Sequence, residues 1–342
     1  MRVATYYSNK DIRIEDRPVP AIGQDELLVR VQACGICGSD VMEWYRLHKV
    51  PLVLGHELAG DVAEAGGKVS RFRKGDRVVI AHHVPCNTCH YCLSGHQTAC
   101  DTLHQTNIDP GGFAEYARIP SINVDRGVFL LPPDVSFEEA TFVEPLACVL
   151  RAQRNARLRQ GQCVLVLGSG TAGLLHINLA RIMGAGFILA TDTNSFRLEK
   201  ARLLGADCSI FADQDISLCL RRNNDNRLAD LVIVCTGATT AVMQALSLVE
   251  RGGTVLFFAP TGPDVTIPLS INDLFWRKDI TLTTSYAGSP EDYRTALKLI
   301  QYKRINLKDM ITHRLGLSDT GTGFQHVVSG RDSVKVIIEC QR

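Results

Sequence analysis

The chain has 342 residues, a length that favours two domains over one large core. Hydrophobic residues make up 45% and charged residues 21%, which is typical of folded globular proteins and excludes disorder. Lys and Arg total 37 against 36 for Asp and Glu, so the net charge is +1; with no dense basic block, neither nucleic acid nor an anionic membrane is an expected partner.

The N-terminal region lacks the apolar run of a secretory signal, and no later segment has about 18 uninterrupted apolar residues. We therefore expect a cytoplasmic protein. In that reducing compartment its twelve cysteines would stay thiols, free to bind metal or to pack in the core.

The first third of the chain is rich in short β-type runs that Gly and Pro separate. They lie at 27–31, 58–65, 77–81 and 113–119. This spacing predicts an irregular, mostly antiparallel β domain.

Four cysteines form a C-x2-C-x2-C-x7-C pattern in a turn-rich lobe, residues 85–101. They are Cys86, Cys89, Cys92 and Cys100. Four thiolates on a short loop suit a closed tetrahedral site for structural zinc. An iron–sulfur cluster is the alternative, but the ferredoxin run has three residues before its fourth Cys and a Pro after it, whereas this chain has seven and then Asp101.

A second, dispersed set comprises Cys34 and Cys37, then His56 and Glu57, and later Glu144. Each residue alone has a structural explanation, as a buried thiol, a satisfied imidazole or a helix-capping carboxylate. Together they offer the mixed ligand set of a catalytic zinc that keeps one coordination position open.

From about Gly161, apolar strands alternate with helical patterns. The strands are expected at 164–167, 188–191, 231–235 and 254–258. Such alternation predicts βαβ units and a parallel sheet. A helix expected at 290–302 and a strand at 334–338 do not extend the series, so we expect the tail to return to the first domain.

The turn after the first of these strands reads Gly168-Ser169-Gly170-Thr171-Ala172-Gly173 and leads into a helix. In this order Gly168 permits the tight turn, Gly170 lets backbone approach a pyrophosphate, and Gly173 allows close helix packing, while the phosphate lies at the helix N-terminus with Thr171 and Ala172. The motif predicts a dinucleotide site.

Asp192 ends the second strand, 19 residues after Gly173, where a carboxylate can accept hydrogen bonds from both ribose hydroxyls of NAD. A 2′-phosphate would meet its negative charge, so NAD is favoured over NADP. Arg197 weakens this argument because it is basic and close by, but its position five residues on suggests that it lies against the adenine.

These motifs, in this order, resemble those of the zinc-containing medium-chain alcohol dehydrogenases, and within them the sorbitol (polyol) dehydrogenase branch. The resemblance runs essentially end to end. It also includes Gly35-Ile36-Cys37-Gly38-Ser39-Asp40, Leu54-Gly55-His56-Glu57, Gly75-Asp76-Arg77-Val78, Glu144-Pro145-Leu146 and Ile311-Thr312-His313-Arg314.

The resemblance implies an α/β fold of two domains. A GroES-like β-rich catalytic domain (1–146, with the structural zinc lobe 85–101) would be completed by residues 286–342. A Rossmann domain, a doubly wound parallel sheet at 147–285, would be inserted between them, with the active site in the cleft.

The resemblance further implies two zinc ions per chain. Cys37 and His56 would hold the catalytic zinc, with Glu57 and Glu144 binding directly, through water or alternately. Ser39 would hydrogen-bond the substrate oxygen and Asp40 would orient the ligand His. Relatives commonly carry His where this chain has Met42, so the proton route is open: His48, or the ribose and solvent, are the candidates.

The implied reaction is NAD-linked oxidation of a secondary alcohol, a polyol, to a ketone by a zinc-dependent enzyme. A threonine or 2,3-butanediol dehydrogenase is the alternative on the same scaffold, and a catalytically silent zinc- and NAD-binding protein is the non-enzyme alternative. Arg46 leaves a phosphorylated substrate open. A homotetramer, or a homodimer, is expected from the resemblance.

Overall fold

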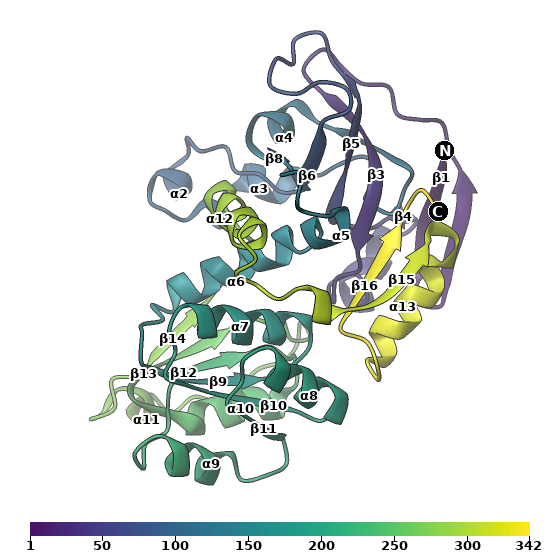
Figure 1. Cartoon of the computed structure of the whole chain (residues 1–342). Coiled ribbons are helices and arrows are strands. Elements are labelled where there is room, and N and C mark those ends of the chain that lie inside the picture. The colour runs from purple at the N-terminus through teal and green to yellow at the C-terminus, as the bar shows by residue number, and fades with distance from the viewer. The chain divides into compact units, whose positions relative to one another are not determined.

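The computed structural model describes all 342 residues, and the chain forms two compact units. The first comprises Met1–Ala147 and Gly288–Arg342, and the second comprises Cys148–Ala287. Both chain ends therefore belong to the first unit, and the second is an insertion in its sequence (Figure 1).

The first unit is built on a seven-stranded sheet. Its strands, in spatial order, are β15 (Ile311–Gly316), β16 (Lys335–Glu339), β3 (Leu27–Gly35), β5 (Glu57–Ala65), β6 (Arg77–Ala81) and β8 (Val128–Leu130), with β7 (Tyr116–Ile119) also paired to β3. Only β15 and β16 run parallel. A second, three-stranded sheet has the order β2 (Asp11–Asp16), β1 (Arg2–Ser8) and β4 (Leu52–Val53).

Short helices connect these strands. They are α1 (Glu43–Arg46), α2 (His90–Leu93), α3 (Asp101–Gln105), α4 (Ser121–Arg126), α5 (Phe137–Ala140), α12 (Pro290–Gln301) and α13 (Thr320–Ser329), with 3-10 turns at Leu47–Lys49, Gln97–Ala99, Lys308–Met310 and Leu317–Asp319. The longer α6 (Val143–Asn155) runs from the first unit into the second.

Strand β3 lies at the centre of the first unit. Eight of its nine residues are buried or half-buried and only Arg30 is exposed, because β5, β7 and β16 all pair with it. Its side chains Leu27, Val29 and Val31 pack in one core with residues of β5 and β6. The end of β3 is therefore a rigid platform for the loop that follows.

The second unit has a six-stranded sheet in which every pairing is parallel. The order is β11 (Cys208–Phe211), β10 (Phe187–Asp192), β9 (Cys163–Leu167), β12 (Ala229–Val234), β13 (Val249–Phe257) and β14 (Thr281–Thr284). In chain order within this unit, that is 3-2-1-4-5-6, the doubly wound arrangement of dinucleotide-binding folds. The predicted α/β fold class is thereby confirmed.

The helices of this unit are α7 (Thr171–Ile182), α8 (Ser195–Leu203), α9 (Ile216–Asn223), α10 (Thr239–Leu248) and α11 (Ile271–Phe275). Strands β9 and β12 lie side by side where the order reverses, and in such sheets ligands bind beyond the carboxyl ends of the strands at that point. The glycine turn after β9 lies there (Figure 1).

No helix in the structure combines the length and the apolar character that crossing a bilayer requires.

Candidate active site and metal centres

Cys37 lies in a tight turn directly after β3. The carboxylate of Asp40 accepts a hydrogen bond from the Cys37 backbone N–H at 3.0 Å, and the Asp40 N–H donates to the Cys37 carbonyl oxygen at 3.0 Å. These two bonds close the turn and fix the direction of the thiol, which stays half-buried.

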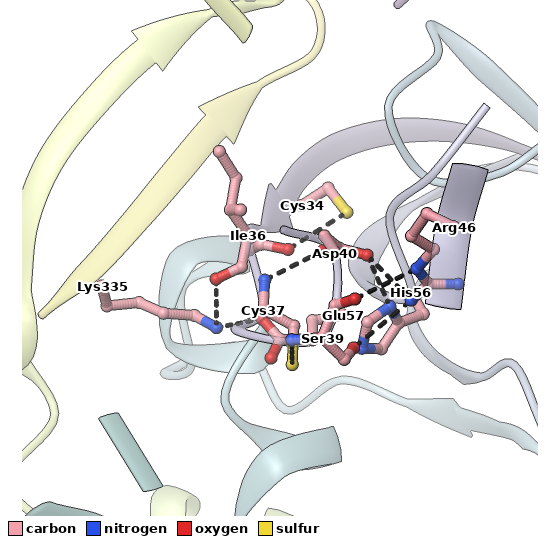
Figure 2. Close-up of polar contacts among 10 residues, drawn as sticks. Cys34, Ile36, Cys37, Ser39, Asp40, Arg46, His56, Glu57 and Lys335 are labelled. Carbon is pink, nitrogen blue, oxygen red and sulfur yellow. Dashed lines mark hydrogen bonds and ion pairs between the residues drawn. The ribbon is translucent and has the colours of Figure 1, made fainter. Parts of the chain in front are cut away.

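The antiparallel pairing of β3 with β5 brings this turn to a second segment of the chain. Gly35, the last residue of β3, pairs with Glu57, the first residue of β5. Consequently the ligand atoms of Cys37, His56 and Glu57 all lie within 4.8 Å of one another (Figure 2). The structure thus assembles a thiol, an imidazole and a carboxylate, a donor set that suits Zn²⁺.

Asp40 also determines which ring nitrogen of His56 is available to a metal. Its Oδ1 lies 3.3 Å from Nδ1 of His56, so the Nδ1 proton is directed to this carboxylate and Nε2 is left as the ligand atom. Burial alone would raise the pKa of Asp40, but His56 and Arg46 hold that pKa below its ordinary value. Asp40 is therefore a buried anion that orients the imidazole.

Glu57 has a cationic partner that sequence reasoning missed. The Nζ of Lys335, the first residue of β16, forms an ion pair with Glu57 Oε2, and both side chains are fully buried. Burial opposes the charge on Lys335, yet Glu57 raises the pKa of the ammonium group, so the pair is ionised. Lys335 is thus a permanent positive charge beside the cluster.

Glu144 lies in the first turn of α6 and is 7% exposed. It is not a member of the group that Cys37, His56 and Glu57 form. Its negative charge contributes to raising the pKa of Lys335, so it lies in the same electrostatic environment. Cys34 is fully buried in the core and is not a member of that group either.

Ser39 has an arginine as its neighbour instead of a histidine. Arg46 donates from Nε to the Ser39 carbonyl oxygen at 3.0 Å and from Nη2 to Ser39 Oγ at 3.4 Å (Figure 2). Nη2 also lies 3.5 Å from Asp40 Oδ1. His48 is exposed and its ring packs 6.4 Å from that of Tyr45.

Two further histidines lie beside His56 and were not predicted. The ring centroid of His82 is 4.8 Å from that of His56, and His83 lies 3.9 Å beyond it. Burial lowers the pKa of His82 well below its ordinary value, so this ring is neutral. Because Ala81 pairs with Glu57 in the β5–β6 ladder, the strand register was the signal that could have located them.

The four lobe cysteines converge as their spacing predicts. The ligand sulfurs of Cys86, Cys89, Cys92 and Cys100 lie within 4.8 Å of one another. The Sγ–Sγ distances are 3.6 Å for Cys89 and Cys92 and 3.9 Å for Cys86 and Cys92, close to the edge of about 3.8 Å in a tetrahedron with Zn–S bonds of about 2.3 Å. Hydrogen bonds from Thr88 and from the Cys89 backbone lower the pKa of Cys86 to about 5, which favours the thiolate.

The three glycines of the turn after β9 have distinct steric roles. Gly168 has φ +92, which favours glycine, and a Cβ on Gly173 would lie 1.9 Å from the Gly168 carbonyl oxygen. A Cβ on Gly170 would meet nothing within 4 Å, so this position opens onto free space. Helix α7 has no side-chain cap, and its first N–H groups, from Thr171, Ala172 and Gly173, suit a phosphate.

Asp192 ends β10 beside this turn. Its Oδ2 accepts a hydrogen bond from the Ser169 N–H at 2.8 Å and its Oδ1 accepts one from the Asn194 N–H at 3.0 Å. On α8, Arg197 carries a buried Nε without a hydrogen-bond partner. Open space at Gly170 and an unsatisfied buried donor at Arg197 both fit a nicotinamide dinucleotide.

Comparison with known proteins gives the family of this chain. Residues 23–128 match the alcohol dehydrogenase GroES-like domain and residues 172–302 match the zinc-binding dehydrogenase domain. The chain is 32% identical to sorbitol dehydrogenase of Gallus gallus over 342 residues, which cover 96% of this chain and 94% of that protein.

Two solved structures share the whole fold. A zinc-binding dehydrogenase from Sinorhizobium meliloti 1021 bound to NADP superposes with a TM-score of 0.88 at 28% identity, covering 99% of each chain. Galactitol-1-phosphate dehydrogenase from Escherichia coli gives a TM-score of 0.85 at 26% identity, covering 99% of this chain and 100% of that one.

The chain belongs to the zinc-binding alcohol dehydrogenase family. It is an oxidoreductase that acts on an alcohol with zinc and a nicotinamide cofactor, which confirms the predicted GroES-like and Rossmann domains and the prediction of an enzyme.

Proposed function

We propose that this enzyme oxidises a secondary alcohol of a polyol to a ketone, with NAD as hydride acceptor. The observation that carries the proposal is the cluster of Cys37, His56 and Glu57, whose ligand atoms lie within 4.8 Å of one another. The backbone N–H of Ser39 lies 3.5 Å from Cys37 Sγ. Zinc held by Cys37 and His56 would supply a Lewis acid for the alcohol oxygen.

The chain's own residues have separate tasks in this proposal. Asp40 orients the imidazole of His56 through Nδ1. Ser39 Oγ would accept the hydroxyl proton of the substrate while its own proton passes on to the ribose or solvent, and Arg46, which donates to that oxygen, would stabilise the partial negative charge that Oγ carries as its own proton leaves. Lys335 holds Glu57 by an ion pair, and Glu144 is the second carboxylate that we propose for the metal.

A polyol fits this cluster better than a simple alcohol. Cys37 is its only thiolate, so the surroundings of the metal are richer in oxygen than in a site with two thiolates, and they tolerate a substrate that binds through neighbouring hydroxyls. The curated relative from Gallus gallus is named sorbitol dehydrogenase, which supports this class. A threonine or butanediol substrate is the alternative on the same scaffold.

We infer a preference for NAD over NADP from Asp192. Its carboxylate is anchored by two backbone N–H groups and would face a 2′-phosphate with like charge. The relative from Sinorhizobium meliloti was solved with NADP, so this preference is a feature to be measured in this chain.

We propose two zinc ions per chain, one at the cluster of Cys37 and His56 and one at the four lobe cysteines. The lobe supports its own metal because its only hydrophobic cluster consists of Leu103 and the cysteines themselves. A closed Cys₄ site would therefore contribute folding free energy, not chemistry. Both thiolate sites need reduced cysteines, which supports a cytoplasmic location.

We propose a homotetramer whose contacts include the outer edge of the parallel sheet. Strand β14 pairs only with β13, and before it the chain exposes large apolar side chains: Ile271 is 66% exposed, Phe275 54% and Trp276 63%. Exposed apolar groups next to a free strand edge are typical of an interface. Sedimentation velocity would reveal a monomer if this proposal is wrong.

The substrate proposal is tested by following NADH absorbance over a panel of polyols, their phosphates, vicinal diols and threonine. We expect the highest kcat/KM for an unphosphorylated polyol, because Arg46 is already engaged by Ser39 and Asp40. A higher value for threonine or a simple diol would contradict the polyol assignment.

The catalytic cluster is tested by His56→Ala. This change removes a proposed zinc ligand but leaves the glycine turn intact, so NAD should still bind while turnover is lost. NAD binding is measured by quenching of Trp fluorescence. Turnover that survives the loss of His56 would rule out zinc catalysis at this cluster.

A further inference from the structure

A third cluster of metal-ligating side chains lies in the first unit and belongs to neither proposed zinc site. It comprises His313 on β15, His326 on α13, and Asp332 in the segment between α13 and β16. Their ligand atoms all lie within 4.8 Å of one another. Nothing in the proposed reaction uses these three residues.

The fold brings the three side chains together from separate elements. Gly330 ends α13 with φ 60, in the left-handed region that favours glycine, and its N–H donates to the His326 carbonyl oxygen. This turn reverses the chain, so Asp332 returns to the side of the helix that carries His326. The rings of His313 and His326 stack with centroids 3.9 Å apart.

Hydrogen bonding determines which nitrogen of His313 faces the cluster. The Thr312 hydroxyl donates to the Lys335 carbonyl oxygen at 3.1 Å, so its only proton is already used. The contact of 3.0 Å between His313 Nδ1 and Thr312 Oγ1 therefore requires Nδ1–H to be the donor. In the neutral ring Nε2 then carries a lone pair.

That lone pair faces a carboxylate with no proton between them. His313 Nε2 lies 4.0 Å from Asp332 Oδ2, and His326 Nδ1 lies 3.7 Å from Asp332 Oδ1. Both distances are too long for a hydrogen bond, and Asp332 accepts none from any other group.

We propose that His313, His326 and Asp332 form a binding site for a divalent transition metal such as Zn²⁺. Two imidazoles and one carboxylate are a donor set that suits such ions. In a tetrahedral zinc site with bonds of about 2.1 Å, ligand atoms are about 3.4 Å apart. The two distances from Asp332 to the imidazoles, 4.0 and 3.7 Å, are about 0.6 and 0.3 Å longer than that spacing, and the Asp332 side chain, 66% exposed, can move to shorten them.

The position of the site gives the metal a structural role. It would tie β15, α13 and the segment before β16 together, and β16 begins with Lys335, the cation that holds Glu57. His313 and His326 have side-chain exposures of 20% and 30%, so the ion would keep contact with solvent at its remaining positions.

The test compares zinc binding by the native chain and its variants. Wild type, His326→Asn, Asp332→Asn and the control Glu64→Gln, which removes an exposed carboxylate of the same unit, are dialysed against the same low micromolar free Zn²⁺. Bound zinc is counted by mass spectrometry. The result is the difference in bound zinc per chain between wild type and each variant. Zinc held at other sites is the same in all four proteins, so it does not affect this difference.

We expect wild type and Glu64→Gln to bind one zinc ion per chain more than either site variant. Equal zinc content in wild type and Asp332→Asn would overturn the proposal, and this variant changes a side chain that is mostly exposed, so it keeps the fold. Anomalous diffraction from wild-type crystals soaked in zinc gives a second readout. A peak among the three side chains supports the site, and none there refutes it.

Discussion

Arg46 holds Ser39 at two points, its Nε on the carbonyl oxygen at 3.0 Å and its Nη2 near the hydroxyl oxygen at 3.4 Å. The polar side chain that contacts this serine is therefore a guanidinium. It cannot accept a proton, so it acts on Ser39 only as a donor and as a positive charge.

The first prediction concerns this contact. Arg46→Met should lower kcat/KM by about tenfold or more, since a hydrogen bond to a charged group is worth about 1.5–3 kcal/mol. The pH profile of kcat/KM should also move to higher pH, because Ser39 loses a neighbouring positive charge. Stopped-flow measurement of hydride transfer separates this effect from product release.

Lys49→Met is the matched control for Arg46. Lys49 lies on the same loop, with Nζ 4.0 Å from the Tyr45 ring centroid, and it contacts neither Ser39 nor Asp40. We expect its kinetics to stay within about twofold of wild type. Equal losses in both variants would mean that the loop, not the contact with Ser39, determines the rate.

The second prediction tests cofactor choice. Asp192→Ser removes the carboxylate expected at the ribose, so NAD should bind less tightly and NADP more tightly, with Arg197 nearest to the new phosphate. The ratio of kcat/KM for NAD over NADP should fall about 100-fold, the equivalent of about 2.7 kcal/mol. An unchanged ratio would mean that Asp192 does not contact the ribose; Asp213→Ser, an exposed carboxylate, is the control.

The third prediction separates folding from chemistry in the lobe. Cys92→Ser should remove one zinc ion and lower the melting temperature by several degrees, because the lobe has almost no apolar core of its own. Turnover per folded molecule should remain. The control Cys219→Ser removes a thiol outside the lobe, and the prediction would be wrong if it lost as much zinc as Cys92→Ser.

The fourth prediction is that the free energy of unfolding of the second unit depends on pH. His176 is fully buried on α7 beside Phe258, and burial lowers its pKa from 6.5 to about 3. Below pH 6.5, His176 is therefore protonated in the unfolded chain but stays neutral in the folded unit. The contribution of neutral His176 to the free energy of unfolding is complete above pH 6.5, and it is lost as the pH falls from there toward about 3.

Between pH 7 and pH 5 this histidine should cost about 2 kcal/mol of unfolding free energy. Urea unfolding of the second unit, followed by hydrogen exchange, should show that His176→Gln removes this part of the acid sensitivity. The exposed His90→Gln should keep it. Identical pH dependence in all three proteins would refute the assignment.

The sequence predicted the parts of the fold that are strongly apolar. Strands β9, β10 and β12 are buried on both faces, and their apolar runs located them within a few residues. Strand β13 was located only by its apolar end, because its first half includes the exposed residues Arg251 and Gly252. Strands β2 and β14 were missed because their sequences, Asp11–Asp16 and Thr281–Thr284, are polar and half-exposed at sheet edges. Edge strands carry no apolar signal that a single sequence can supply.

The start of α7 shows a different limit. The sequence predicted a helix after the glycine turn, but the helix begins at Thr171, within the turn, and includes Gly173. Glycine disfavours a helix by about 1 kcal/mol, so propensity argued against this start. Close packing decides instead, since any Cβ at Gly173 would collide with the Gly168 carbonyl oxygen.

The candidate site was predicted where its residues lie in motifs. Cys37, His56 and Glu57 were found in this way. Lys335 was not, because it lies 278 residues from Glu57 and nothing local marks it as a partner. Long-range ion pairs depend on sheet topology, here the pairing of β16 with β3, which no spacing rule encodes.

The inserted arrangement also sets an order of events on the ribosome. Every strand of the second unit has been synthesised once residue 287 has emerged, so that unit can fold early. The first unit must wait, because β16, which pairs with its central strand β3, comes last. Until β16 is synthesised, Glu57 lacks its partner Lys335. A nascent chain whose second unit can already bind the nucleotide therefore still has an incomplete catalytic domain.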